Sequence, residues 1–257
     1  MSMSLQAGVA IRDSSVPSPL TAFSRSVMDM LERIEYRRCE SGEDLEAVYR
    51  LRYKAFHSHG LLDTILDGKL VDHLDETANC YSFGIFMDGQ LVSTVRLHHL
   101  THATPMAPIM TVFGDRLMPR LAAGDTFIDP SRLSIDPDLT SSANRSLPYV
   151  TLRLAVMANE YFDTTSCVSM IRAEHTAFYQ RIFGSAAVGA PRLYPPFTMP
   201  IFLYESRCDE NMQPTLERFP FFHSTAGERR MMFAKPAKGE LAPLTILPTA
   251  KYWHQAA

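Results

Sequence analysis

Two strand-like segments joined by Asp88-Gly89 constrain the fold of this chain most strongly. Residues 81–87 and 90–98 are rich in β-branched, aromatic and other apolar side chains, which is typical of strands. Asp-Gly favours the type I′ turn that connects two antiparallel strands. The sequence therefore predicts an antiparallel hairpin, and the fold must contain a sheet built around it.

The segments around this hairpin alternate between helix and strand patterns. Helices are expected over residues 19–35, from Ser41 through Phe56, around the apolar stripe of residues 147–161, and over 173–183. Strands are expected over residues 34–39, 126–135 and 165–171, near 187–193, and over 201–206. Residues 57–79 read as a long loop and 101–124 as a Met- and Pro-rich excursion. This order predicts an α+β or mixed α/β class, with one mixed sheet and helices on both faces.

Length and composition indicate one large domain with extensions. A domain usually has roughly 150 residues, and the chain has 257. We expect an N-terminal extension with a short helix over residues 1–33, a main domain over 34–208 and a C-terminal appendage over 209–257. Apolar residues make up 46% and charged residues 21%, which excludes a disordered, collagen-like or coiled-coil chain. The net charge of −3 provides no basic field for nucleic acid.

The sequence predicts a cytoplasmic protein. No apolar run approaches the ~20 residues that cross a bilayer, and the first residues lack the basic and apolar regions of a secretory signal. The four cysteines are scattered without a Cys-x-x-Cys pair, which indicates reduced thiols rather than disulfides or a zinc site. No metal site is expected at His98, His99 and His102, because no carboxylate or cysteine lies at ligand spacing.

Several charged residues interrupt apolar patterns. Arg52 lies in the apolar stripe of its predicted helix, so it either has buried partners or extends to solvent at the edge of the stripe. Arg96 shares a strand face with apolar neighbours and needs a partner or a position near a cleft. Asp72 and Asp75, three residues apart, are either such partners or two acids of a solvated loop.

Asp129 and Arg132 are separated by Pro130 and Ser131 within a predicted strand. In a regular strand, residues three apart point to opposite faces. Proline cannot donate to a sheet and is confined to edges and bulges. A bulge would turn Asp129 and Arg132 toward one side and separate this strand from its neighbour, whereas a proline-containing turn accounts for the sequence equally well.

Taken in order, these residues form a pattern that resembles a known family. The motifs are Arg52-x-x-x-Phe56, Asp72-x-x-Asp75, Arg96 at a strand end after a hairpin, and Asp129-x-x-Arg132. They are similar to those of the acyl-homoserine-lactone synthases and their relatives, the N-acyl amino acid synthases. The segment His175-x-x-Phe178-Tyr179-x-Arg181-x-Phe183-Gly184 resembles the closing segment of the same fold. Residues 191–196, Pro-Arg-Leu-Tyr-Pro-Pro, look closer to the amino acid synthase branch.

The resemblance implies a GCN5-related N-acyltransferase (GNAT) fold, with a central, mostly antiparallel sheet that contains one splayed strand pair. It also implies transfer of a long-chain fatty acyl group from an acyl carrier protein thioester to the amine of an amino acid or related metabolite. Asp129 is the expected general base and Tyr179 the expected acid. The expected substrate-binding residues are Arg52, Phe56, Asp72, Asp75, Arg96 and Arg132, and the expected acyl pocket residues are Met157, Val168, Met170 and Phe178.

Three departures from the family pattern bear on the substrates. Residues 57–62 contain no tryptophan, which lactone synthases usually carry there, and this weakens the case for S-adenosylmethionine. Asp129 stands where the family usually has glutamate. Residues 138–146 lack the glycines that let a loop wrap the pyrophosphate of coenzyme A. An acyl carrier protein, which presents only a phosphopantetheine arm, is therefore the expected donor and partner.

No tightly bound cofactor is expected, because the acyl-phosphopantetheine thioester, on carrier protein or on coenzyme A, is itself a substrate. Three alternatives stay open: an acyl-homoserine-lactone synthase, an acyl-CoA-dependent N-acyltransferase, and a lipid-binding module that has lost catalysis. A hydrolase is disfavoured because the chain has no Gly-x-Ser-x-Gly elbow. Arg145, Arg153 and Arg181 are candidate contacts for an acidic carrier protein. The sequence leaves acyl chain length, the acceptor and the oligomeric state open.

Overall fold

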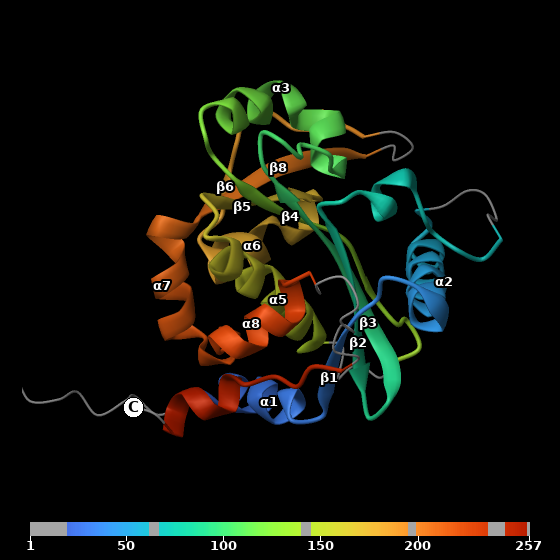
Figure 1. Cartoon of the computed structure of the whole chain (residues 1–257), viewed down its shortest axis with the longest axis vertical. Helices are drawn as coiled ribbons and strands as arrows, with labels where there is room; N and C mark the ends of the chain where they lie inside the picture. The colour runs from blue at the N-terminus through green and yellow to red at the C-terminus, as the bar shows by residue number, and fades with distance from the viewer. Residues whose placement is uncertain (1–19, 62–66, 140–144, 195–198, 236–244, 256–257) are drawn as a thin grey trace, which may run out of the picture.

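The fold is organised around one eight-stranded sheet (Figure 1). The computed structural model describes residues 20–61, 67–139, 145–194, 199–235 and 245–255. Neighbouring strands follow the order β1-β2-β3-β4-β5-β8-β6, and β7 pairs with β8 off this path. The strands are β1 (Ile34–Arg38), β2 (Cys80–Met87), β3 (Gln90–Leu100), β4 (Phe127–Ile135), β5 (Ser166–Ile171), β6 (Ala186–Ala187), β7 (Arg192–Leu193) and β8 (Pro200–Arg207).

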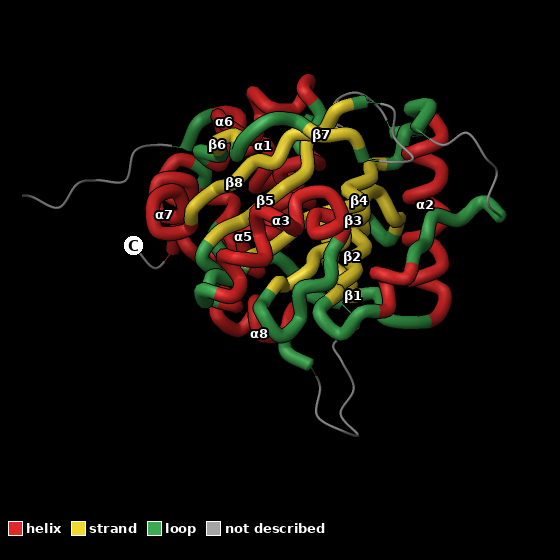
Figure 2. The backbone as a smooth tube through the Cα atoms, turned by 90° about the horizontal axis from the view of Figure 1, so that it is seen from above, coloured by secondary structure: helices red, strands yellow, loops and turns green. Residues whose placement is uncertain are grey.

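Helices cover both faces of the sheet (Figures 1 and 2), as the sequence predicts. On one face α5 packs with α1, α6 and α8, while α2 and α3 lie on the other. The helices are α1 (Ala22–Leu31), α2 (Gly42–Ser58), α3 (Pro108–Ala122), α5 (Leu147–Phe162), α6 (Thr176–Phe183), α7 (Cys208–Arg218) and α8 (Ala226–Phe233). The short 3-10 turns are η1 (His73–Glu76), η2 (Ala173–His175), η3 (Pro220–Phe222) and η4 (Ala250–Gln255).

The β2–β3 hairpin predicted from Asp88-Gly89 is confirmed. The two strands pair antiparallel from Cys80 opposite His98 to Met87 opposite Gln90. Asp88 and Gly89 have φ values of 51° and 80°, as a type I′ turn requires. The hairpin forms the centre of one half of the sheet, with β1 on its outer side and β4 on its inner side.

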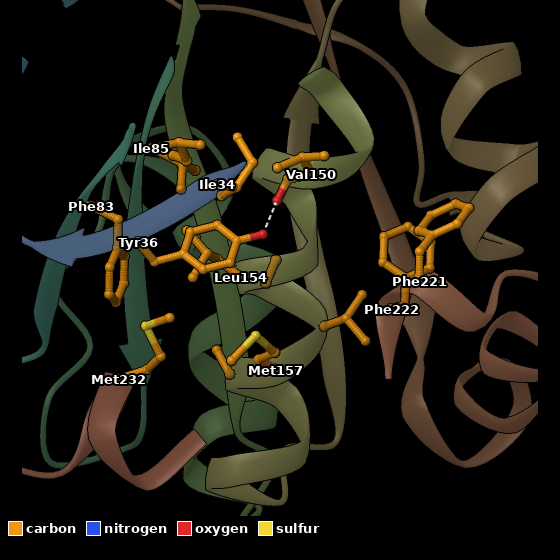
Figure 3. Packing of buried hydrophobic residues seen from close by; sticks show 14 of the residues in the cluster. Ile34, Tyr36, Phe83, Ile85, Val150, Leu154, Met157, Phe221, Phe222 and Met232 are labelled. Atoms are coloured by element: carbon orange, nitrogen blue, oxygen red, sulfur yellow. Dashed lines mark hydrogen bonds between the residues drawn. The ribbon is translucent and has the colours of Figure 1, made fainter. Parts of the chain in front are cut away.

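The larger core lies between the sheet and α5. The apolar stripe of α5, predicted from the sequence, packs on the inward side chains of β1, β2 and β3. Tyr36 on β1 donates its hydroxyl hydrogen to the carbonyl oxygen of Val150 on α5, over 2.8 Å (Figure 3). Because α5 is buried on nearly every side, it is a central helix rather than a surface one.

Among the described residues, no helix has the length and apolar composition needed to cross a membrane.

Two regions contain helices that the sequence patterns did not indicate. Residues 101–124, expected as an excursion, contain α3, which begins with Pro108 in its first turn and bends at Phe113. Its apolar face packs on Phe127, Val168 and Leu203 of the sheet. Proline is well tolerated in a first turn, so Pro108 was the start signal. Beyond residue 208, α7 and α8 form despite a proline inside α7.

The β4–β5 pair opens after two residues. These strands run parallel, and only Phe127 pairs with Ser166 and Ile128 with Cys167. Beyond that point β4 continues along β3 and β5 along β8. The other strand pairs described are antiparallel. Asp129 is therefore the first β4 residue past the point where the two strands separate, which we call the strand split.

A bulge in β4 follows the strand split. Thr94 pairs with Ser134 while Arg96 pairs with Ser131, so β4 has one residue more than β3 between these pairs. Arg132 lies in this bulge with φ of 53°, a left-handed conformation that non-glycine residues rarely adopt. Of the two interpretations of Asp129-Pro130-Ser131-Arg132, the bulge is correct and the turn is not.

Candidate active site

Five charged side chains gather on the face of the sheet that α2 covers. We call them the charge cluster: Arg52 of α2, Asp72 and Asp75 of η1, Arg96 of β3 and Arg132 of β4. Arg52 lies 2.7 Å from Asp75, and Arg96 lies 2.7 Å from Asp72 and 3.0 Å from Asp75. Arg132 lies 2.8 Å from Asp72. The structure thus brings together five of the six charged residues that the motifs from Arg52 to Arg132 contain, and Asp129 is the sixth.

The inner part of the charge cluster is closed off from solvent. The side chains of Arg52, Arg96 and Asp75 are fully buried, so Arg52 does not extend to solvent at the edge of its helix. Hydroxyl groups complete the set, because Arg52 donates to Ser82 at 3.1 Å and Arg96 to Ser131 at 3.2 Å. A buried arginine is tolerated only when such partners compensate the loss of water.

The turn η1 fixes the two carboxylates. Asp72 accepts a hydrogen bond from the backbone N–H of Leu74, and Asp75 accepts one from the backbone N–H of Asp72, each at 3.0 Å. This reciprocal pair is a capping box, so the three-residue spacing has a local structural reason. Burial opposes the ionised form of Asp72, but the ion pairs with Arg96 and Arg132 outweigh it and hold its pKa well below the usual value.

Arg132 forms the solvent-facing edge of the cluster. About 16% of its side chain is exposed, whereas those of Arg52 and Arg96 are fully buried. Its guanidinium lies 5.5 Å from the ring centroid of Phe56 on α2, within the range of a cation–π contact. Of these three arginines, Arg132 is the one that a molecule arriving from solvent can reach.

Asp129 lies beside this cluster at the strand split, and none of the described residues forms an ion pair with it. It is fully buried, and its Oδ2 accepts a hydrogen bond from the backbone N–H of Ile109 in the first turn of α3, at 3.3 Å. Its Oδ1 has no hydrogen-bond partner within the part of the chain that the structure describes. Burial raises the pKa of Asp129 to about 7, against the opposing effects of the Ile109 N–H and the charge of Arg96. The carboxyl group can therefore take up or release a proton near neutral pH.

Tyr179 lies on the other face of the sheet. It is half-buried on α6 and lines an apolar pocket with Pro130 of β4 and Cys167 of β5. Burial raises its pKa, and the negative charge of Asp129 adds to this effect. The phenol therefore stays protonated and can act as a proton donor. The pocket and the charge cluster lie on opposite faces of the sheet, and both are next to the strand split.

A family model establishes the relationship that this geometry suggests. The model of the N-acyl amino acid synthase FeeM matches residues 47–207. The chain belongs to this family. The matched segment contains the whole charge cluster, Asp129 and Tyr179, and family membership makes the protein an acyltransferase. No curated protein matches the sequence.

FeeM and TofI share the fold of this chain at low sequence identity, and LasI is less similar. FeeM from uncultured soil microbes has a TM-score of 0.56 and 16% identity, covering 69% of this chain and 92% of its own. TofI, solved in a ternary complex with an inhibitor and MTA, has a TM-score of 0.51 and 14% identity, covering 74% and 100%. The AHL synthase LasI has a TM-score of 0.47 and 18% identity, covering 67% and 88%. The predicted resemblance and the GNAT-like fold class are confirmed.

The four residues that the family resemblance predicted for the acyl pocket lie on two different faces of the sheet. Val168 and Met170 point to the face under α3, whereas Met157 and Phe178 belong to the core on the α5 face. Alternate residues of a strand point to opposite faces, so the β5 residue that lines the pocket is Cys167. The pocket at the strand split is lined instead by residues of α5, α6 and α7, among them Leu152, Val156, Phe183, Met212 and Thr215.

One expectation about the arginines needs correction. Arg153 is fully buried and pairs with Glu228 of α8 at 2.5 Å, so it does not face a carrier protein, whereas Arg145 and Arg181 are exposed.

The sequence patterns did not indicate that α7 contributes to the pocket, because residues beyond 208 showed no clear pattern. His98 was considered only as a metal ligand, yet it lies opposite Asp129, and the period of β3 could have placed it there.

Proposed function

We propose that this member of the FeeM family transfers a fatty acyl group from an acyl carrier protein to the amino group of an amino acid. One observation carries the proposal: Asp129 is a buried carboxyl group with a free oxygen and a pKa near neutral, at the strand split. The charge cluster lies on one side of it and the apolar pocket on the other. This arrangement supports two substrates that approach from opposite faces and react between them.

In the proposed reaction, Asp129 takes one proton from the acceptor's ammonium group, because only a neutral amine is nucleophilic. The amine nitrogen attacks the thioester carbonyl carbon, a C–N bond forms, and the carbonyl oxygen becomes negative. Beyond Ile128, no described strand pairs with the side of β4 that faces β5, so backbone N–H groups there can stabilise the oxyanion. The C–S bond then breaks, and the thiolate receives the remaining surplus proton of the nitrogen through Tyr179.

Arg132 is the proposed clamp for the acceptor. Its side chain is partly exposed and pairs, among the described carboxylates, with Asp72. This leaves donor groups for a second carboxylate, which arginine binds well. Arg52 and Arg96 are already enclosed by buried partners. An acceptor that carries both an amino group and a carboxylate, as an amino acid does, would bridge Asp129 and Arg132.

An acyl carrier protein is the proposed donor. Residues 138–146 contain no glycine, and a loop with side chains cannot wrap a pyrophosphate closely. Residues 140–144 of this segment lie outside the described part of the chain. Comparing palmitoyl-carrier protein with palmitoyl-CoA at equal concentration tests this choice, and we expect the carrier protein to be used with the larger kcat/KM.

Mass spectrometry of lipids from cells that overproduce the protein tests the function as a whole. We expect a new N-acyl amino acid whose mass identifies both the acyl chain and the acceptor. Cells that produce the Asp129→Asn variant at the same level are the matched control, and the new lipid should be absent from them. An unchanged lipid profile in the wild-type cells, with the protein present and folded, would contradict the proposal.

A further inference from the structure

His98 lies beside the proposed base and is held in one tautomer. It pairs in register with Asp129 across β3 and β4, and residues directly opposite in an antiparallel pair point to the same face. Its Nε2 lies 3.0 Å from the carbonyl oxygen of Leu74 in η1. A carbonyl oxygen only accepts hydrogen bonds, so Nε2 carries the hydrogen and Nδ1 keeps its lone pair.

In the described structure, two hydrogen-bond acceptor atoms on this face, one of His98 and one of Asp129, lack a donor. Both residues are fully buried, and among the described residues neither His98 Nδ1 nor Asp129 Oδ1 has a hydrogen-bond partner. An unsatisfied polar atom in a protein interior is costly, and such atoms are rare in native structures. Two of them on adjacent strands, at the strand split, are what a site for a hydrogen-bond donor requires.

His98 also keeps its acceptor character at physiological pH. Burial lowers its pKa to about 4, and the charge of Arg96 acts in the same direction against the opposing effects of the Leu74 carbonyl, Asp75 and Asp72. The side chain of Cys80, opposite His98 on β2, stays a neutral thiol because burial raises its pKa to about 11. The imidazole is therefore neutral.

We propose that His98 Nδ1 and Asp129 Oδ1 together hold the acceptor's amino group and make the enzyme selective for primary amines. The inference rests on the acyl transfer proposed above and names the class of its acceptor. Asp129 takes one proton of the ammonium group, and His98 accepts a hydrogen bond from a second N–H. Deprotonation by Asp129 frees the nitrogen lone pair for attack on the thioester. After the attack, the nitrogen of a primary amine still has two N–H groups, one for the hydrogen bond to His98 and one whose proton goes to the thiolate. A secondary amine has only one, so it loses the hydrogen bond to His98 when that proton leaves.

The His98→Gln variant separates this role from a structural one. Its amide nitrogen can still donate to the Leu74 carbonyl, but no acceptor remains at the position of Nδ1. With the best acceptor from a panel of the common amino acids, we expect kcat/KM for the acceptor to fall roughly ten- to a hundredfold. The KM for the acyl donor should stay unchanged. The wild-type preference for that amino acid over its N-methyl derivative should largely disappear.

His99→Gln is the matched control. His99 is the next residue and also has an unpaired ring nitrogen, but its ring stacks on Phe162 of α5 at 4.1 Å, on the opposite face. This variant should keep the wild-type acceptor KM and the preference for the primary amine. A His98→Gln enzyme with wild-type kcat/KM and wild-type discrimination against the N-methyl derivative would overturn the inference.

Failure of the inference can be told apart from failure of the proposed function. If the wild-type protein acylates none of the amino acids, the proposed function fails and the inference fails with it. If His98→Gln does not fold, ¹⁵N NMR of histidine-labelled wild-type protein replaces it. The Nδ1 resonance of His98 should shift when the primary amine is added and shift less with its N-methyl derivative; no shift with a saturating amine would overturn the inference.

Discussion

Asp129 sits in an environment that disfavours its own charge. It is fully buried, it accepts one backbone hydrogen bond, and the charge of Arg96 compensates only in part. An acid whose pKa is raised on folding binds a proton more tightly in the native state than in the unfolded one. The proposed catalytic base should therefore reduce stability at neutral and alkaline pH.

The pH dependence of stability tests this directly. The pKa of Asp129 rises from 3.8 in its ordinary state to about 7 in the fold, so this group's contribution to stability is lost as pH rises from about 4 to about 7. Replacing the carboxyl group by an amide removes this loss. Relative to wild type, Asp129→Asn should gain up to about 4 kcal/mol in unfolding free energy between pH 4 and pH 8.

Urea denaturation of both proteins at a series of pH values measures the effect. Every other titrating group is shared, so the difference between the two proteins isolates Asp129. A difference in unfolding free energy that stays constant from pH 4 to pH 8 would show that the carboxyl group is not raised in pKa, and the assignment of Asp129 as the base would lose its physical basis.

At the scale of elements, the bulge in β4 positions Arg132 at a conformational cost. Its φ of 53° is a left-handed conformation that costs a non-glycine residue about 1–2 kcal/mol. Glycine adopts it freely. The strain persists because the bulge directs the guanidinium onto Asp72 and Phe56, which is the placement that the proposed acceptor clamp needs.

Two variants of Arg132 separate strain from side-chain contacts. Arg132→Gly and Arg132→Ala both lose the ion pair with Asp72, but only glycine relieves the backbone. We expect Arg132→Gly to be more stable than Arg132→Ala by about 1 kcal/mol, measured by urea denaturation, and both to have a raised KM for the acceptor. Equal stability of the two variants would contradict the left-handed backbone at this position.

How much of the site the sequence predicts depends on the element that carries each residue. The charge cluster was expected from the family resemblance, whereas the apolar patterns around Arg52 and Arg96 showed only that these residues are unusual and left extension of Arg52 to solvent open. For Asp129 and Arg132, Pro130 left a bulge and a turn equally open, and only the pairing of β4 with β3 decides for the bulge. The residues of the proposed acyl pocket could not be predicted in this way, because the choice between Cys167 and Val168 depends on which face of β5 the pocket occupies. A one-residue shift reverses that face, and the sequence alone does not fix it.

At the scale of the whole molecule, the segment beyond residue 208 is tied into the main core. Phe221, Phe222, Met232 and Phe233 join the apolar cluster that contains α5. Arg153 of α5 makes a buried ion pair with Glu228 of α8. We infer that this segment contributes to the stability of the entire fold. The sequence indicated an appendage but not this anchor, because Arg153 and its partner are far apart along the chain.

Removing one partner of this pair should destabilise the whole protein. Glu228→Ala leaves the Arg153 guanidinium buried without a carboxylate, which typically costs about 3–5 kcal/mol. Asp209→Ala is the matched control, because it breaks an ion pair with Arg207 in which both side chains are exposed, and breaking such a solvent-exposed pair changes stability little. Thermal or urea unfolding measures both, and similar losses for the two variants would contradict an anchoring role for Glu228.

The central claim is that Asp129 deprotonates an amine at the strand split, and the rate of amino-acid-dependent thiol release tests it most directly. The purified protein is supplied with an acyl-carrier protein and the amino acid identified from the cellular lipid. We predict that the kcat/KM of the wild type rises with pH through about 7, and that Asp129→Asn, still folded, is slower by about 10²–10⁴-fold. Thiol release by Asp129→Asn at the wild-type rate, with the same pH profile, would contradict the account.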